Sequence, residues 1–251
     1  MSEKKNGSKL SRRSFMKRLS AGSAAAALTT TLATTARAVT PTRKVRYGML
    51  IDTRRCIGCH ACSVACKAEF DVPLGSTRSW VEYVEKGQYP YVTRNFIPRL
   101  CNHCEHPPCV DVCPTRATWK REEDGIVVVD PDICIGCKYC VQACPYDARF
   151  LNPVTGAADK CDFCLHRVSR GLVPACVETC IGRARIFGDL NDPESEISRL
   201  IASNPVQVLR PAQGTEPNVF YIGLDHADEH DVVHRNQYVR VTTHRRQQER
   251  R

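Results

Sequence analysis

Sixteen cysteines, arranged in four groups of four, constrain this chain of 251 residues more than any other feature. The groups are Cys56, Cys59, Cys62 and Cys66; Cys101, Cys104, Cys109 and Cys113; Cys134, Cys137, Cys140 and Cys144; and Cys161, Cys164, Cys176 and Cys180. Three residues separate the last two cysteines of every group, and no cysteine is left over. Because 7% of the chain is aromatic, something other than aromatic packing must hold it together. Disulfides or metal groups are the candidates.

The spacing within the groups suits 4Fe-4S clusters, which are held by four cysteine thiolates. Three cysteines, with two residues between one and the next, together supply three thiolates from one tight loop. Gly58 and Gly136 lie inside two such loops, where glycine can take a positive φ and turn backbone N–H groups toward the sulfides. The fourth cysteine lies one helical turn beyond the third, so it points away and serves the second cluster of a pair. We therefore expect four 4Fe-4S clusters and short helices that carry the fourth cysteines.

Other interpretations of the cysteines fit the sequence less well. A zinc site uses two pairs of cysteines, and a run of three suits it poorly. A disulfide framework would not repeat the three-residue spacing four times. His60, His103, His106 and His166 lie near the groups, but sixteen cysteines already complete four clusters. We therefore expect these histidines to be surface residues or neighbours of the sites, not ligands.

The basic charge of the chain is concentrated in its first 38 residues. These carry eight of the 36 Lys and Arg and one of the 27 acidic residues, and thus +7 of the net charge of +9. The rest of the chain is nearly neutral. Its charge therefore gives no support for nucleic-acid binding.

The order of features in this N-terminal segment resembles a bacterial twin-arginine signal peptide. Arg12 and Arg13 stand in the stretch SRRSFMK, a weakly apolar region follows over 19–33, and Ala-Arg-Ala at 36–38 forms a cleavage pattern. An amphipathic helix or an unstructured arm would explain the arginine pair alone, but not this order of features. The twin-arginine route carries folded proteins, so a cluster built in the cytoplasm crosses intact. We expect a mature chain that begins at Val39 and works in the periplasm.

Outside the cysteine groups, the residue pattern predicts short strands, two hairpins and one helix. The expected strands are 43–52, 91–97 and 185–187, the hairpins are 118–130 around Gly125 and 149–160 around Asn152 and Pro153, and the helix spans 192–202. No run of 18 apolar residues occurs, so the sequence predicts no transmembrane helix of ordinary length. We divide the chain into a signal segment, 1–38, a cluster-binding region, 39–190, and a C-terminal extension, 191–251, with a polar, flexible tail.

Strand, cysteine loop and short helix follow one another in the manner of a ferredoxin used twice. The relevant stretches are YGMLIDTRRCIGCHAC (47–62), PRLCNHCEHPPCVDVCP (98–114), CIGCKYCVQACPYDARF (134–150) and LVPACVETCIGRARIFGDL (172–190). They resemble the four-cluster iron–sulfur (beta) subunits of membrane-linked molybdopterin oxidoreductases, with the tetrathionate reductase branch as the closest likeness. Polysulfide, thiosulfate and nitrite reductase branches share much of the pattern. The chain departs from it where Lys67 and Ile181, instead of proline, follow Cys66 and Cys180.

This resemblance implies an α+β fold of two loop-rich, ferredoxin-like dicluster modules with hairpin insertions. It also implies crosswise ligand sets, because groups one and four exchange their fourth cysteines, as do groups two and three. The implied sets, called A to D in this order, are Cys56, Cys59, Cys62 and Cys180 (A); Cys66, Cys161, Cys164 and Cys176 (B); Cys101, Cys104, Cys109 and Cys144 (C); and Cys113, Cys134, Cys137 and Cys140 (D).

The resemblance also implies an electron-transfer subunit without catalytic residues of its own. Electrons would pass from a polytopic, quinone-reactive membrane subunit through the clusters to a molybdopterin catalytic subunit that reduces tetrathionate or a similar sulfur compound. The alternative is an equivalent subunit of a nitrite, sulfite or other anaerobic respiratory complex. Cations near the groups are candidates to favour the reduced clusters, and solvated surface explains each of them equally well. These cations are Arg54, Arg55, Lys138, Lys160 and Arg183.

Overall fold

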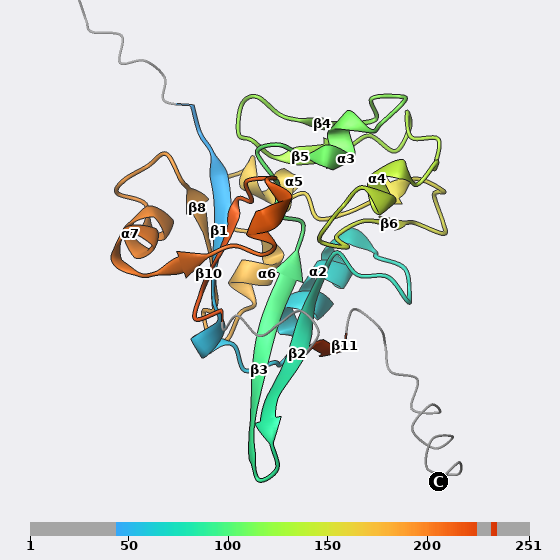
Figure 1. Ribbon diagram of the computed structural model, residues 1–251. Helices are drawn as coiled ribbons and strands as arrows, with labels where there is room; N and C mark the ends of the chain where they lie inside the picture. The colour runs from blue at the N-terminus through green and yellow to red at the C-terminus, as the bar shows by residue number, and fades with distance from the viewer. Residues whose placement is uncertain (1–43, 225–231, 235–251) are drawn as a thin grey trace, which may run out of the picture. The chain divides into compact units, whose positions relative to one another are not determined.

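The computed structural model describes residues 44–224 and 232–234, which all belong to one unit of the chain, 44–251 (Figure 1). The predicted signal segment, 1–38, lies outside these residues, as does most of the predicted tail. The strands are β1 (Tyr47–Asp52), β2 (Ser79–Gln88), β3 (Tyr91–Leu100), β4 (Thr118–Lys120), β5 (Val127–Val129), β6 (Phe150–Leu151), β7 (Ala158–Asp159), β8 (Arg185–Asp189), β9 (Val206–Gln207), β10 (Val219–Ile222) and β11 (Val232–His234). The helices are η1 (Thr53–Arg55), α2 (Ala61–Phe70), α3 (Pro108–Asp111), α4 (Tyr139–Gln142), α5 (Leu165–Val168), α6 (Ala175–Glu178), α7 (Glu196–Ser203) and η2 (Pro211–Gln213).

A four-stranded sheet with the order β8–β1–β10–β9 supports the first and fourth cysteine groups. β1 is parallel to β10 and antiparallel to β8. One face of β1 packs against α7 through Leu50 and Ile197, while Met49 and Ile51 lie in the apolar core that contains Cys62 and Cys176. Burial on both faces explains the unbroken apolar run that leads into the first cysteine loop. Because α7 and β10 follow residue 190, the start of the predicted extension completes this sheet.

Two pairs of short helices bring the cysteine groups together. α2 contacts α6, which joins the first group to the fourth, and α3 contacts α4, which joins the second group to the third. Figure 1 shows α3 and α4 beside the small hairpins and α6 beside the main sheet, while α2 contacts both α6 and β2. The fold is therefore α+β with two modules, each built on one helix pair.

The short helices end before the fourth cysteine in three of the four groups, contrary to the prediction. α3, α4 and α6 contain the third cysteines, Cys109, Cys140 and Cys176. Two of the fourth cysteines, Cys113 and Cys144, precede prolines, and a residue before proline disfavours the helical conformation. Lys67 stands in the place of proline after Cys66, and there α2 continues to Phe70.

The predicted hairpins and strands are present. β4 pairs with β5 around Gly125, which has a φ of +75°, and β6 pairs with β7. The predicted strands 91–97 and 185–187 fall within β3 and β8. The helix predicted over 192–202 begins four residues later, because Ser195 caps it: its Oγ accepts a hydrogen bond from the N–H of Ser198 at 3.2 Å.

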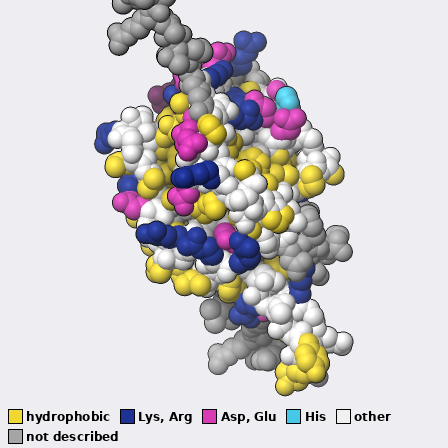
Figure 2. Space-filling view, turned by 90° about the vertical axis from the view of Figure 1, so that its left-hand side faces the viewer, with side chains coloured by type: hydrophobic (Ala, Val, Ile, Leu, Met, Phe, Trp, Pro, Cys, Tyr) yellow, Lys and Arg dark blue, Asp and Glu magenta, His cyan; other side chains and the backbone are white. Residues whose placement is uncertain are grey.

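A long hairpin of β2 and β3 projects downward in Figure 1, and β2 is not among the predicted strands. Glu82 interrupts the apolar pattern of β2, yet it is buried, because its carboxylate accepts from Arg99 on β3 (Nη1–Oε2 2.8 Å). Tyr89 and Tyr91 at the turn are exposed, and Figure 2 shows hydrophobic side chains at this lower end.

The C-terminal part contains a strand that the sequence does not predict. β11 pairs with β2, so that β11, β2 and β3 form a three-stranded sheet. The sequence predicts a polar, flexible tail after residue 225. Among the described helices, none combines the length and the apolar character needed to cross a bilayer.

Candidate metal centres

All sixteen cysteines lie in the described residues, and each is a free thiol. Cys59 and Cys137 are exposed, and the other fourteen are buried or half-buried. Within the described ranges, no three Cys, His, Asp or Glu side chains are close enough together to hold one metal ion. A 4Fe-4S cluster takes four thiolates around a larger body of iron and sulfide, so the arrangement of the thiols in space decides whether they fit such a group.

The thiols of set A line one small cavity. Its lining includes Cys56, Cys59, Cys62 and Cys180. Burial raises the pKa of the Cys56 thiol, and the neighbouring thiols of Cys62 and Cys180 raise it further. A Cβ on Gly182 would lie 2.3 Å from the backbone oxygen of Arg55. Glycine at 182 therefore permits the close approach that joins the first group to the fourth.

The thiols of set B are neighbours in the core. Burial raises the pKa of Cys66 to about 12, and the nearby thiols of Cys176 and Cys164 add to the rise. Burial also raises the pKa of Cys161, with Cys66 and Cys176 again next to it. These four residues come from the first and fourth groups, so the fourth cysteine of the first group, Cys66, lies near thiols of the fourth group.

The thiols of set C are likewise close together. Burial raises the pKa of Cys104 to about 12, and the thiols of Cys101, Cys109 and Cys144 lie around it. Burial and then Cys101 raise the pKa of Cys144. The fourth cysteine of the third group therefore lies among the first three cysteines of the second.

Set D is the more exposed end of the second module. Cys137 is exposed, Cys113 and Cys134 are half-buried, and Cys140 is buried. Cys134 and Cys140 share a small apolar core with Ala158, whose N–H donates to Cys134 Sγ at 3.3 Å. The membership of Cys113 in set D rests on the resemblance.

Glycine shapes two of the cysteine loops as predicted. Gly58 and Gly136 have φ values of +69° and +68°. A Cβ at Gly58 would lie 2.4 Å from the ring of Phe96, and one at Gly136 would lie 2.5 Å from the backbone oxygen of Gly156. Each loop therefore needs glycine for both its backbone conformation and its packing.

A repeat after the fourth cysteine orients backbone amides toward sulfur in three groups. Three residues beyond that cysteine, Arg116, Asp147 and Arg183 have positive φ values of 56°, 54° and 48°. Each is followed by a buried alanine, namely Ala117, Ala148 and Ala184. The N–H of Ala184 donates to Cys180 Sγ at 3.2 Å. The backbone N–H groups of Ala117 and Ala148 likewise donate to the sulfurs of Cys113 and Cys144. The recurring alanine four residues after the cysteine is a sequence signal that was overlooked.

The residue after this alanine is a buried arginine in two of the groups, and neither was predicted. Arg149 Nη2 donates to Cys109 Sγ at 3.0 Å, and Arg185 Nη1 lies 3.9 Å from Cys176 Sγ. Burial lowers the pKa of each guanidinium, but the neighbouring cysteine side chains outweigh it, so the pKa of both is raised. Of the five predicted cations, Lys160 is buried. The other four, Arg54, Arg55, Lys138 and Arg183, are exposed.

The four histidines near the groups have partners other than cysteine. His103 is buried, stacks on Phe163 at 3.7 Å, and accepts at Nδ1 from the N–H of Val127. Burial, and then the charges of Lys160 and Arg149, lower its pKa well below the usual range. The remaining contacts are His60 with Tyr83, His106 with Glu216, and His166 with Glu69.

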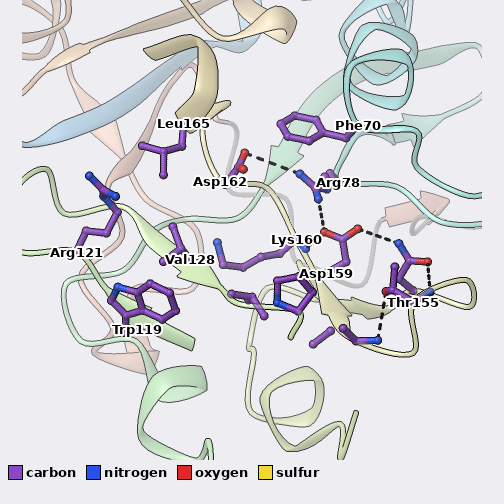
Figure 3. Close-up of a pocket in the computed structure, with 15 residues that line it drawn as sticks. Phe70, Arg78, Trp119, Arg121, Val128, Thr155, Asp159, Lys160, Asp162 and Leu165 are labelled. Carbon is purple, nitrogen blue, oxygen red and sulfur yellow. Dashed lines mark hydrogen bonds and ion pairs between the residues drawn. The ribbon is translucent and has the colours of Figure 1, made fainter. Parts of the chain in front are cut away.

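A cavity of about 460 Å³ opens beside Lys160 (Figure 3). Arg78 makes an ion pair in its wall: Arg78 Nη2 lies 2.6 Å from Asp159 Oδ1, and the Arg78 guanidinium lies 3.9 Å over the ring of Phe70. Because Phe70 ends α2 and Asp159 ends β7, this wall ties the two modules together.

Known domain families match the same part of the chain. One 4Fe-4S dicluster domain matches residues 55–118, and a second matches residues 92–190. Together the matches span all four cysteine groups, and the thiol donor sets described above fit such clusters. The chain therefore falls in the class of proteins with two 4Fe-4S dicluster domains.

Curated relatives narrow this class to one family. The chain is 56% identical over 186 residues to the B subunit of tetrathionate reductase from Salmonella typhimurium, and the match covers 72% of this chain and 74% of the relative. It is 46% identical over 186 residues to protein NrfC of Escherichia coli, and the match covers 73% of this chain and 83% of the relative. It is 44% identical over 180 residues to the B subunit of polysulfide reductase from Wolinella succinogenes, and the match covers 70% of this chain and 94% of the relative. The chain belongs to the family of iron–sulfur electron-transfer subunits of reductase complexes.

Proposed function

We propose that this chain holds four 4Fe-4S clusters and relays electrons between a quinone-reactive membrane subunit and a molybdopterin catalytic subunit. The observation that carries the proposal is the distribution of exposure among the ligand sets. Cys59 of set A and Cys137 of set D are exposed, while sets B and C are buried apart from the half-buried Cys144. Two accessible ends separated by a buried middle suit a relay.

The proposed ligand sets are sets A to D. The cavity lined by set A and the mutual proximity of the thiols in sets B and C support this assignment. When bound, each cluster supplies exchange of one electron. The protein's own part is to hold four thiolates per cluster, to exclude water from the middle two, and to orient backbone N–H groups toward sulfur.

The sets follow one another in the order A, B, C, D. Cys176 of set B lies close to Cys62 of set A, and Cys161 of set B lies close to Cys101 of set C. Sets C and D meet where Cys109 and Cys140 share one apolar core. This order supports a single path from one exposed end to the other.

Apolar residues surround both exposed ends and support docking of partner subunits there. Beside set A, Ile57, Val64 and Ile181 are 62%, 65% and 76% exposed. Beside set D, Ile135 and Tyr139 are 67% and 57% exposed. We assign one end to the catalytic subunit and the other to the polytopic membrane subunit.

The proposed terminal acceptor is tetrathionate or a similar sulfur compound, and the high identity to the B subunit of tetrathionate reductase supports this choice. The similarity to protein NrfC keeps a nitrite, sulfite or other respiratory complex as the alternative. Membranes that contain the whole complex can be reduced anaerobically and followed by electron paramagnetic resonance. Addition of tetrathionate should reoxidise the clusters, and nitrite or sulfite should not. Reoxidation by nitrite or sulfite alone would overturn the choice and favour the alternative.

We also propose that residues 1–38 are a twin-arginine signal that directs the folded, cluster-loaded chain to the periplasm. The region 39–190 binds the clusters and 191–251 extends it. The proposal is supported by the order of the arginine pair, the apolar segment and the Ala-Arg-Ala site.

Changing Arg12 and Arg13 together to lysine should leave the protein in the cytoplasm with its iron intact, because that route requires the arginine pair. Cell fractionation with iron analysis measures this outcome. Arg18→Lys, which alters an arginine outside the pair, is the control and should be exported normally. Normal delivery of the double variant, when no partner bears a signal of its own, would refute the assignment.

A further inference from the structure

Three cations are buried among the cysteines without a carboxylate partner in the described part of the chain. Arg185, Lys160 and Arg149 are 2%, 3% and 5% exposed. By contrast, the buried Arg99 makes an ion pair with Glu82. A buried charge requires an opposite charge nearby to offset the cost of removing it from water. The negative charge available to these three cations is that of the cysteine thiolates and whatever they bind.

Arg185 stands at the junction of sets A and B. It lines the cavity of set A, and its Nη1 lies 3.9 Å from Cys176 Sγ of set B. Ser79 Oγ accepts from its Nη2 at 2.8 Å and holds the guanidinium in place.

Lys160 stands at the junction of sets B and C. Its Nζ donates to the backbone oxygen of Cys161, a residue of set B, at 2.6 Å, and to that of Val127. Val127 shares an apolar core with Cys109 of set C. Figure 3 shows the Lys160 side chain running from the segment just after β7 toward β5, beside Val128.

Arg149 stands at the junction of sets C and D. Its Nη2 donates to Cys109 Sγ of set C at 3.0 Å and to Thr118 Oγ1 at 2.9 Å. The N–H of Thr118 in turn donates a hydrogen bond to the sulfur of Cys113 of set D. Cys140 of set D is a further neighbour of Arg149. One fixed cation therefore lies at each of the three junctions between the four sets.

We propose that Arg185, Lys160 and Arg149 are shared counter-charges, each of which favours reduction of the two clusters on either side of it. An oxidised cluster with its four thiolates carries about two negative charges, and reduction adds one. Two reduced neighbours repel each other, and away from water this repulsion is strong. A buried cation between them lowers the free energy of both reduced states, so adjacent clusters can hold electrons at the same time. The proposal rests on the ligand sets given under Proposed function.

The test uses the cluster-loaded full chain, titrated with dithionite and followed by electron paramagnetic resonance. Arg149→Met removes a charge while keeping a long side chain. It should lower the equilibrium constant for reduction of the clusters in sets C and D by about tenfold or more, which is 59 mV per tenfold for a one-electron couple. Lys160→Met should instead lower the equilibrium constant for reduction of the clusters in sets B and C. The cluster in set C therefore moves in both variants, and the cluster in set A moves in neither.

Two controls separate charge from structure. Arg149→Lys keeps the charge and should stay near the wild-type potentials. Lys138→Met removes an exposed cation between two cysteines of set D, where water screens the charge, and should change the potentials little. A shift of one cluster alone, or of none, in variants that retain full iron would overturn the proposal. If Arg149→Met loses iron, the proposal is decided by Lys160→Met, in which the reduction potentials of the clusters in sets B and C should shift together. A wild-type chain with half the iron would instead overturn the ligand sets themselves.

Discussion

Replacing Cys144 with serine should lower the iron content from about sixteen to about twelve atoms per chain, the loss of one four-iron cluster. The missing cluster should be that of set C, although Cys144 follows the cysteines of set D in the sequence. The physical reason is the spacing of three residues between Cys140 and Cys144, which turns Cys144 away from its own loop and places it beside Cys101. The cluster held by Cys134, Cys137, Cys140 and Cys113 keeps all four thiolates in this variant.

Cys113→Ser is the matched variant, because the two residues hold mirrored places in the second module. It should spare set C and remove the cluster of set D. Redox titration by electron paramagnetic resonance distinguishes the two centres when the variants are compared side by side. If Cys144→Ser abolished the signal of set D and left that of set C, each group would hold its own cluster and the crosswise sets would be wrong.

Much of the fold was predictable because short-range spacing controls it. The loops around Gly58 and Gly136, the turn at Gly125 and the hairpin around Asn152 all depend on neighbours within a few residues. The structure has positive φ at all three of these glycines. The helix expected to begin at 192 begins later, because Ser195, three positions further on, caps it and Asp192 does not.

The features that were missed depend on contacts across the chain. β2 contains Glu82, which a local pattern assigns to solvent. It is buried because it makes an ion pair with Arg99, two residues along β3 from its register partner Ile97. Arg149 and Arg185 look like ordinary polar residues after a cysteine loop, and they are buried because thiols from distant groups surround them. Exposed Arg54 shows the converse, since proximity in sequence to a cysteine group does not bring burial.

Iron, sulfide and zinc analysis of the anaerobically purified full chain tests the four-cluster account most directly. Sixteen thiols arranged as four donor sets should hold about sixteen irons and about sixteen sulfides per chain, four of each for every set. The material should be brown, and zinc should be present in trace amounts at most. An iron content near eight with equal sulfide, or stoichiometric zinc in place of iron, would contradict the account.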